Sequence, residues 1–498
     1  MSDRSRVSLA TGILLVILAT MGYAISPPAF DPPPMVGGAA LPALPPQPPA
    51  EYRPVATPAA VTVQEVRVPV RGETLTATIR SPRTPGRHPA MVFVQGSGSG
   101  DRGEFTTQAT WLARAGVITL AYDKRTAGYD FRHRDFALLA EDALHMVELL
   151  RRRADVDPAR TGLWGVSEGT WVTPIAAARS ADVRYMVMVS APNVTPVRQV
   201  AWALNEQLER LSAPDGVRDL LTRAMGGVGF DFLRYDGVPA LRRMRQPVLA
   251  LYGTTDPSIP FVESTRTLVS ALADAGNADY TIRFIAGADH AMRIKGGAFT
   301  QQYLRTMANW ITALPGTARP AAEVRVAGAT PVQRYETADV PKAPWYGRGA
   351  FLGLAVMLAA VGYVAVPVTE MVARLRGRDL LPAGRPDRWP AVRRRLRRLV
   401  WTGVGLFASV MAFIMLIVLF SVNQAGAWPA VLAGWLVVRV LAMLMLVQEV
   451  TAVAAVAGAL RDGWQPSRGQ RFALAAVLGG TALLLVAAAY YGLFGIPW

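Results

Sequence analysis

Residues 161–170 read TGLWGVSEGT, a pattern that predicts a short strand, a tight turn and the start of a helix. The turn has the form G-x-S-x-G, with Ser167 between Gly165 and Gly169. Glycines at these positions leave room where a Cβ would clash, and the sharp turn projects the serine hydroxyl. The N–H groups of the following helix face the place where an oxyanion would form. Ser167 is therefore a candidate nucleophile, and the alternative is an ordinary turn serine.

A nucleophilic serine needs a base to take its proton and a carboxylate to hold that base in the right tautomer. In a doubly wound hydrolase these follow in the order serine, acid, histidine, on loops after late strands. Of the four histidines in the chain, only His290 follows Ser167, and it comes just after a predicted strand at residues 281–285. We therefore predict His290 as the base.

The acid should follow the preceding strand, which we expect at residues 248–252. The next residues are Gly-Thr-Thr-Asp-Pro, so Asp256 is the candidate acid. Two alternatives stay open. Asp-Pro commonly opens turns, and Asp289 is a rival acid, although its adjacency to His290 makes the required geometry awkward.

A second oxyanion donor is expected from the loop after the predicted strand at residues 90–94. This loop reads QGSGSGDR from Gln95 to Arg102. Its glycines let the backbone approach a ligand closely. We predict that the backbone N–H of Ser97 acts together with that of Glu168, the residue after the nucleophile.

Strand-like runs alternate with helix-length segments between residues 61 and 314, after a predicted hairpin around Arg71-Gly72. Such alternation predicts an α/β fold with a doubly wound, mostly parallel sheet covered on both faces. The alternation pauses at about residues 192–246, where two predicted helices occupy the position of a small inserted lid. The predicted strands lie at residues 90–94, 118–122, 162–166, 185–190, 248–252 and 281–285. The predicted helices lie at residues 107–115, 136–153, 168–179, 197–211, 217–225, 261–275 and 299–314.

Apolar segments long enough to cross a ~30 Å hydrocarbon core flank this region. Residues 7–26 follow Arg4 and Arg6 and predict either an uncleaved signal anchor or a signal peptide, with Gly22-Tyr23-Ala24 as a cleavage site. Four further apolar regions predict an all-α membrane domain. They lie at residues 349–368, 399–422, 429–460 and 472–495. The third is long for one span, so one tilted helix and a broken pair both stay open.

The net charge of +16 invites a nucleic-acid interpretation, which the location of the charge argues against. Residues 370–398 hold ten arginines against three acids, and three more arginines lie within residues 461–471. Both clusters adjoin apolar spans, which is the pattern of cytoplasmic loops in membrane proteins. We therefore expect a multi-pass protein of the bacterial cell membrane, with residues 61–314 on the extracytoplasmic side. The broken-pair alternative would move the C-terminus to the other side.

The remaining segments separate the predicted domains. A Pro- and Ala-rich stretch at residues 27–60 is unsuited to building a core and predicts a stalk. A polar linker is expected at residues 315–348. The predicted order is thus an anchor or signal peptide at 1–26, the stalk, a catalytic domain at 61–314, the linker and the membrane domain at 349–498. The chain has no cysteine, which excludes disulfides and thiolate chemistry.

Taken together, these motifs resemble the α/β-hydrolase superfamily, and most closely its dienelactone-hydrolase-like and serine-aminopeptidase-like esterases. The resemblance covers roughly residues 61–314. It departs from the family pattern at Gln95, where histidine is common, and at Thr126, where glycine is usual. The matching pieces are GVSEG, YGTTDPSIP, GADHAM, QGSGSGDRG and Tyr122-Asp123-Lys124-Arg125.

The resemblance implies a serine hydrolase that cleaves small-molecule or lipid esters through an acyl-enzyme, without metal or organic cofactor, and the apolar segments outside the resemblance predict that it is anchored in a membrane. Membrane lipids are expected as partners and nucleic acid is not; protein partners of the membrane domain are unknown. The alternatives are a peptidase, an acyltransferase acting on envelope lipids, and a membrane transport or sensor protein whose hydrolase-like domain only binds ligand.

Several charged residues outside the triad have two interpretations each. Asp123, Lys124 and Arg125 either hold a loop at a strand end or bind substrate, and we favour the structural role. Glu206 and Glu209 of the predicted lid lie on a solvated face or bind a substrate's amino terminus. Three polar residues within residues 429–460 either snorkel and pack or mark a functional site. These are Arg439, Gln448 and Glu449.

Overall fold

The computed structural model describes residues 3–35, 43–55, 59–98, 100–375, 388–422 and 428–495. The chain divides into two compact units. The sheet unit comprises Asp31–Glu206 and Phe230–Asp339. The helical unit comprises Met1–Phe30, Gln207–Gly229 and Val340–Trp498.

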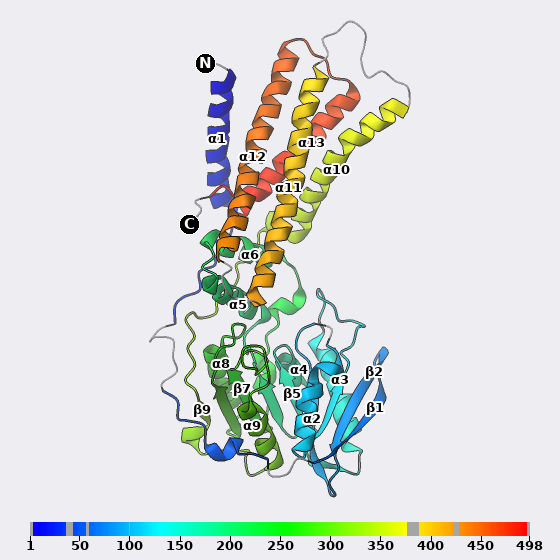
Figure 1. Ribbon diagram of the computed structural model, residues 1–498, viewed down its shortest axis with the longest axis vertical. Helices are drawn as coiled ribbons and strands as arrows, with labels where there is room; N and C mark the ends of the chain where they lie inside the picture. Colours follow the sequence, from blue (N-terminus) through cyan, green and yellow to red (C-terminus); the bar gives the residue numbers. More distant parts are fainter. Residues whose placement is uncertain are drawn as a thin grey trace. The chain divides into compact units, whose positions relative to one another are not determined.

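Within the described residues, the sheet unit contains one sheet of nine strands in the order β1-β2-β4-β3-β5-β6-β7-β8-β9 (Figure 1). β1 and β2 form the predicted antiparallel hairpin, β2 pairs antiparallel with β4, and every other pairing is parallel. The predicted doubly wound, mostly parallel sheet is confirmed. The strands are β1 (Val61–Val70), β2 (Glu73–Pro82), β3 (His88–Val94), β4 (Ile118–Tyr122), β5 (Val156–Val166), β6 (Met186–Val189), β7 (Val248–Gly253), β8 (Tyr280–Ile285) and β9 (Val326–Gly328).

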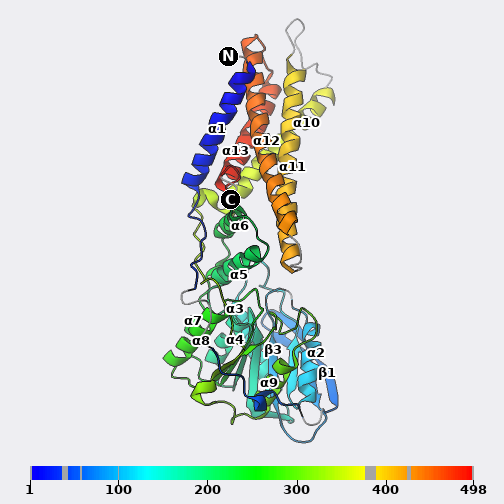
Figure 2. The ribbon, with the colours of Figure 1, turned by 60° about the vertical axis from the view of Figure 1, so that its left-hand side comes forward.

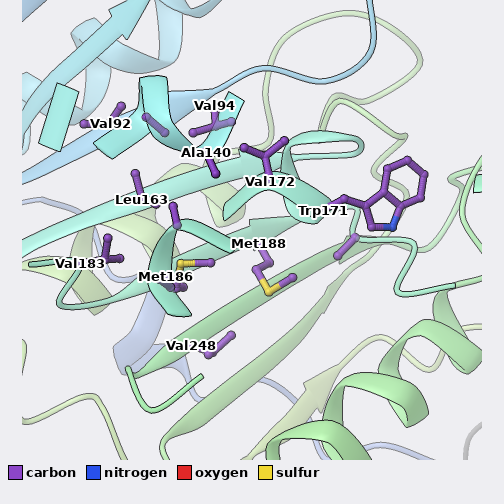
Figure 3. Close-up of a cluster of buried hydrophobic side chains, with 14 of the residues drawn as sticks. Val92, Val94, Ala140, Leu163, Trp171, Val172, Val183, Met186, Met188 and Val248 are labelled. Atoms are coloured by element: carbon purple, nitrogen blue, oxygen red, sulfur yellow. The ribbon is translucent and has the colours of Figure 1, made fainter. Parts of the chain in front are cut away.

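Helices cover both faces of this sheet, and strand residues alternate between the two cores. On β3, Met91 and Phe93 pack with residues of α2 and α9. Val92 and Val94 point to the opposite face, where α3, α4 and α8 pack (Figure 3). A side chain of this kind contributes ~1.5–3 kcal/mol when fully buried. The helices are α2 (Thr106–Arg114), α3 (Phe136–Arg151), α4 (Gly169–Arg179), α8 (Phe261–Asp274) and α9 (Gln301–Thr312).

Two segments predicted as stalk and linker are packed against the sheet unit along part of their length. The 3-10 helix η1 (Pro49–Tyr52) packs on α9, and Glu51 forms two hydrogen bonds of 2.6 Å with the guanidinium of Arg283 in β8. Arg283 is fully buried, so its charge requires such a partner. In the predicted linker, β9 pairs in parallel with β8. Proline-rich composition disfavours regular structure here without preventing packing.

Five long helices of the helical unit lie side by side (Figures 1 and 2). Four of the described helices contain a stretch that is long and apolar enough to cross a membrane, at Ser5–Ile25, Trp389–Ile417, Pro429–Arg461 and Arg468–Tyr490, and a shorter apolar helix covers Gly349–Val364. Residues 376–387 of the predicted arginine-rich loop lie outside the described residues. The five helices are α1 (Asp3–Ile25), α10 (Gly349–Leu375), α11 (Trp389–Val422), α12 (Trp428–Arg461) and α13 (Arg468–Tyr490).

The long apolar region at residues 429–460 lies in one continuous helix, α12, so the broken-pair alternative is not adopted. The three polar residues singled out in this region have defined surroundings. The Arg439 guanidinium donates to the carbonyl of Gly495, and Gln448 accepts from the hydroxyl of Thr402 at 3.1 Å. Glu449 is buried among the helices.

The two predicted lid helices are present as α5 (Pro196–Arg210) and α6 (Asp215–Gly227). Residues 207–229 group with the helical unit and the rest of the predicted lid with the sheet unit. Glu209, at the end of α5, lies 3.7 Å from Arg218 of α6. Glu206 is buried, which excludes a solvated position for its side chain.

Candidate active site

The G-x-S-x-G segment forms a sharp turn between β5 and α4. Ser167 has φ +52°, a strained conformation for a residue with a side chain. Its N–H donates to the carbonyl of Val189 in β6 at 3.0 Å, which fixes the turn to the sheet. A Cβ at Gly165 would lie 2.7 Å from the carbonyl oxygen of Gly169. A Cβ at Gly169 would lie 2.5 Å from that of Val94, so both glycines are sterically required.

His290 and Asp256 follow the neighbouring parallel strands β8 and β7, which brings them to the same edge of the sheet. His290 Nδ1 lies 2.8 Å from Asp256 Oδ2. The Asp256 side chain is buried, and its Oδ1 accepts from the N–H of Ser258 at 2.7 Å. The carbonyl of His290 accepts from the hydroxyl of Ser190 at 2.8 Å. The imidazole ring and the backbone of His290 are therefore each held by a hydrogen bond.

The rival acid Asp289 has a different role in this loop. Its Oδ1 accepts from the backbone N–H groups of Ala291 and Arg293, each at 2.9 Å, and shapes the turn that presents His290. Of the two aspartates, Asp256 is therefore the one placed to orient the imidazole.

The surroundings of His290 shift its pKa upwards. Burial by itself would lower the pKa, but the charge and hydrogen bond of Asp256, with the charge of Asp289, raise it above its ordinary value. The imidazolium is thereby stabilised, which is what a general base needs at the moment it accepts a proton.

Ser167, His290 and Ser97 line one cavity of about 330 Å³. The structure thus brings together the predicted nucleophile, base and one oxyanion donor, with Asp256 in contact with the base. Four aromatic side chains contribute to the cavity lining, and one of them, Tyr303, donates to Gln108 at 3.0 Å. The other lining residues include Phe105, Trp164, Phe299, Glu104 and Arg293.

Glu168 has a buried carboxylate with three donors around it. Lys124 Nζ and the hydroxyl of Tyr129 donate to Oε1 at 2.6 and 2.7 Å, and the Arg134 guanidinium donates to Oε2. Lys124 also donates to the carbonyl of Gly96 at 2.6 Å. Burial lowers the pKa of Lys124, and the charge and hydrogen bond of Glu168 counteract this effect.

The neighbours of Lys124 have structural contacts, in agreement with the interpretation favoured from the sequence. Arg125 forms a bidentate pair with buried Asp142 at 2.6 and 3.1 Å. Asp123 accepts from the backbone N–H of Arg102 at 3.0 Å. Gln95 is the residue that stands where histidine is common in the family. Its side-chain amide is buried and donates to the carbonyl of Tyr122, which joins the ends of β3 and β4.

Tyr129 and Arg134 were not singled out by the sequence analysis. They lie opposite each other in an antiparallel bridge at the ends of a short loop. Asp130 closes this loop by accepting from the backbone N–H groups of Arg132 and His133, at 2.6 and 2.7 Å. The only available signal was their proximity to the Asp-Lys-Arg motif.

Residues 103–316 match the family model of the prolyl oligopeptidase family, Peptidase_S9. This match, the sheet order and the turn at Ser167 decide the fold of the sheet unit. It is an α/β-hydrolase fold. The family match supports a domain of the serine hydrolase class.

Two curated relatives are similar to parts of the chain. Esterase EstD from Thermotoga maritima is 28% identical over 221 residues, which cover 39% of this chain and 52% of the relative. Polyketide transferase ATR5 from Stachybotrys chlorohalonatus is 31% identical over 151 residues, covering 29% and 50%. The chain thus spans about half the length of these relatives. Among solved structures, a putative dienelactone hydrolase from Klebsiella pneumoniae is 20% identical, covers 50% of this chain and 95% of that chain, and has a TM-score of 0.36.

Proposed function

We propose that the sheet unit is a serine hydrolase that cleaves carboxylic esters through a Ser167–His290–Asp256 triad. One observation carries this proposal: Ser167 and His290 line the same cavity, and His290 Nδ1 is hydrogen-bonded to buried Asp256. The strained turn at Ser167 supports it, as do the four aromatic side chains in the cavity lining.

In this mechanism Ser167 Oγ attacks the acyl carbon while His290 Nε2 takes the hydroxyl proton. The carbonyl π electrons move onto the oxygen, and the N–H groups of Ser97 and Glu168 stabilise the resulting oxyanion. The intermediate collapses as the alcohol leaves with the proton from His290. Water then attacks the acyl-enzyme by the same steps and restores Ser167. Asp256 keeps the imidazole in the tautomer that can accept at Nε2.

The leading test is replacement of the nucleophile. Ser167→Ala removes the attacking oxygen, so it should abolish hydrolysis of short p-nitrophenyl esters and labelling by a fluorophosphonate. A second candidate function uses the same residues. The prolyl oligopeptidase match suggests peptide substrates, and the relative named as a polyketide transferase suggests transfer of the acyl group to an acceptor other than water.

Product analysis separates these chemistries. The protein is incubated with matched ester and peptide substrates, each with and without an alcohol acceptor. Free acid from the ester alone supports the esterase proposal. Cleaved peptide supports a peptidase, and an acceptor ester in excess of free acid supports an acyltransferase. A folded protein that binds these compounds without converting any of them would support the non-catalytic binding alternative.

We further propose that the helical unit spans a membrane and that the sheet unit lies on the extracytoplasmic side. The apolar helices and the arginine clusters at their ends support this placement. The absence of native cysteine allows a direct test. In spheroplasts, an impermeant maleimide should label Thr84→Cys on the sheet unit, and Asp462→Cys between α12 and α13 only after permeabilisation. The reverse pattern would contradict the orientation.

A further inference from the structure

One buried cation is hydrogen-bonded to both residues that neighbour the proposed oxyanion hole, to the backbone of Gly96 and to the side chain of Glu168. Lys124 Nζ lies 2.6 Å from the carbonyl oxygen of Gly96 in the loop after β3 and 2.6 Å from the carboxylate of Glu168 after the nucleophile. The side chains of Lys124 and Glu168 are only 3% and 1% exposed. Neither residue is among those that line the cavity, so the Lys124 ammonium and the Glu168 carboxylate are not placed to touch substrate.

The contact with Gly96 acts on the proposed donor itself. The carbonyl of Gly96 and the N–H of Ser97 belong to the same planar peptide group. An ammonium on the carbonyl oxygen therefore fixes the direction of that N–H. It also draws electron density towards the oxygen, and such polarisation strengthens a hydrogen bond by ~10–30%.

The Tyr129 side chain and the backbone of Lys124 hold further residues of this loop. The backbone N–H of Gly98 donates to the hydroxyl of Tyr129 at 3.2 Å, and the N–H of Lys124 donates to the carbonyl of Gly100 at 3.0 Å. Lys124 Nζ also donates to the Tyr129 hydroxyl at 2.9 Å and lies 4.0 Å from the centre of its ring. The loop is thus held at residues 96 and 98 by the side chains of Lys124 and Tyr129, and at residue 100 by the backbone of Lys124.

We propose that Lys124, held by Glu168 and Tyr129, is a positioning residue of the oxyanion hole. It sets the distance and direction of the N–H groups of Ser97 and Glu168 relative to each other. The proposal rests on the proposed function. During attack, the Ser167 Oγ–carbon bond forms, the proton moves to His290 and the carbonyl π pair becomes the oxyanion. Lys124 stays protonated and transfers nothing.

This role predicts an effect confined to the transition state, because the hydrogen bonds from the two N–H groups strengthen most when the oxygen becomes charged. Loss of Lys124 should therefore lower kcat and leave KM nearly unchanged. A purely structural ion pair would instead change thermal stability without a selective loss in kcat.

The neighbouring residue provides a matched control. The side chain of Arg125 is also 3% exposed and is paired with buried Asp142. It also donates to the carbonyls of Ala127 and Arg71 and lies 3.9 Å from the carboxylate of Glu73. Lys124→Met and Arg125→Met each remove one buried cation next to a buried carboxylate. In the full-length protein both should lower the melting temperature. Only Lys124→Met should lower kcat, by about 10- to 100-fold, the range seen when groups that orient metal ligands are removed.

A transition-state analogue supplies the decisive measurement. A trifluoromethyl ketone adds Ser167 Oγ reversibly and places a hemiketal oxyanion in the hole, whereas the matching methyl ketone remains largely a neutral carbonyl. In Lys124→Met, the inhibition constant of the trifluoromethyl ketone should rise by the same factor as kcat/KM falls. The inhibition constant of the methyl ketone should stay unchanged. Unchanged affinity for the trifluoromethyl ketone would overturn the proposal, as would equal losses of kcat in Lys124→Met and Arg125→Met.

Tyr129→Phe keeps the proposal testable if Lys124→Met does not fold. It deletes only the hydroxyl that accepts from Gly98 and Lys124 and donates to Glu168. We expect a several-fold fall in kcat with a parallel loss of affinity for the trifluoromethyl ketone; wild-type values for both would overturn the proposal. Ser167→Ala is measured in parallel. If Ser167→Ala is inactive while Lys124→Met and Tyr129→Phe are fully active, only the positioning role is rejected. If Ser167→Ala is active, the proposed function itself is rejected.

Discussion

Asp256→Asn is the sharpest perturbation of the proposed triad, because the structure dictates how the new amide would lie. Asp256 Oδ1 accepts from the N–H of Ser258 at 2.7 Å, while Oδ2 faces His290 Nδ1 at 2.8 Å. In the asparagine variant, the amide oxygen should keep the bond to Ser258. The amide NH₂ then faces Nδ1, which must accept, and the imidazole proton moves to Nε2.

A histidine that carries its proton on Nε2 cannot take the proton of Ser167. The same substitution in a Ser-His-Asp protease, a worked example of this effect, lowers kcat about 10⁴-fold, which corresponds to ~5.5 kcal/mol in the activation free energy. We expect a loss of similar size here, with KM changed little. The assay is steady-state hydrolysis of a p-nitrophenyl ester at several pH values, with circular dichroism as a control for folding. A kcat within tenfold of wild type would refute the assignment of Asp256.

Three further predictions address the base, the turn and the packing of the N-terminal segment. Because His290 must be neutral to act as a base and its pKa is raised, kcat/KM should rise with pH and reach half its maximum above pH 6.5. Asp289→Asn removes one of the charges that raise this pKa, so the rise in kcat/KM should move to lower pH. An unchanged pH profile would argue against the electrostatic account. Gly169→Ala places a Cβ 2.5 Å from the carbonyl oxygen of Val94 and should destabilise the fold by ~1–3 kcal/mol in denaturant titrations, whereas Gly229→Ala, where a Cβ meets nothing within 4 Å, should change the free energy of unfolding little. Glu51→Ala leaves the fully buried Arg283 without its carboxylate and should cost ~3–5 kcal/mol, against less than ~1 kcal/mol for Asp274→Ala in the exposed pair with Arg242; equal costs would show that the Arg283 pair is not a buried one in solution.

The sequence was informative wherever a local pattern decides the structure. Each of the three proposed triad residues follows a short apolar run that ends in a polar or glycine-rich loop. They are Ser167, Asp256 and His290. Parallel pairing then places the carboxyl ends of these runs at one edge of the sheet, so the order of motifs along the chain was enough to predict which residues meet.

Contacts between distant segments without periodicity were not predictable in this way. Tyr129 and Arg134 lie in a loop, and their contacts with Glu168 depend on how that loop packs against the turn at Ser167. The pair of Glu51 with Arg283 joins residues 232 positions apart, and composition alone suggested that the segment around Glu51 was a stalk. A buried arginine in a predicted strand was the available clue, since a buried charge needs a partner.

In the helical unit, too, local patterns were predictable and contacts between distant segments were not. The length of each apolar run predicted a long helix. The run at residues 429–460 was long enough for one helix or two, and the structure has one continuous helix there, α12. The grouping of residues 207–229 with that unit had no signal in the sequence, because an amphipathic helix does not specify which apolar surface it packs against.

Labelling by a fluorophosphonate is the most direct test of the central claim that Ser167 is an activated nucleophile. The reagent forms a covalent bond only with a serine whose hydroxyl is activated by a base. Wild-type protein should be labelled at Ser167, as located by peptide mass spectrometry, and labelling should disappear in Ser167→Ala but persist in Ser180→Ala at the far end of α4. Undiminished labelling of Ser167→Ala, or labelling of the wild type at another serine, would contradict the account.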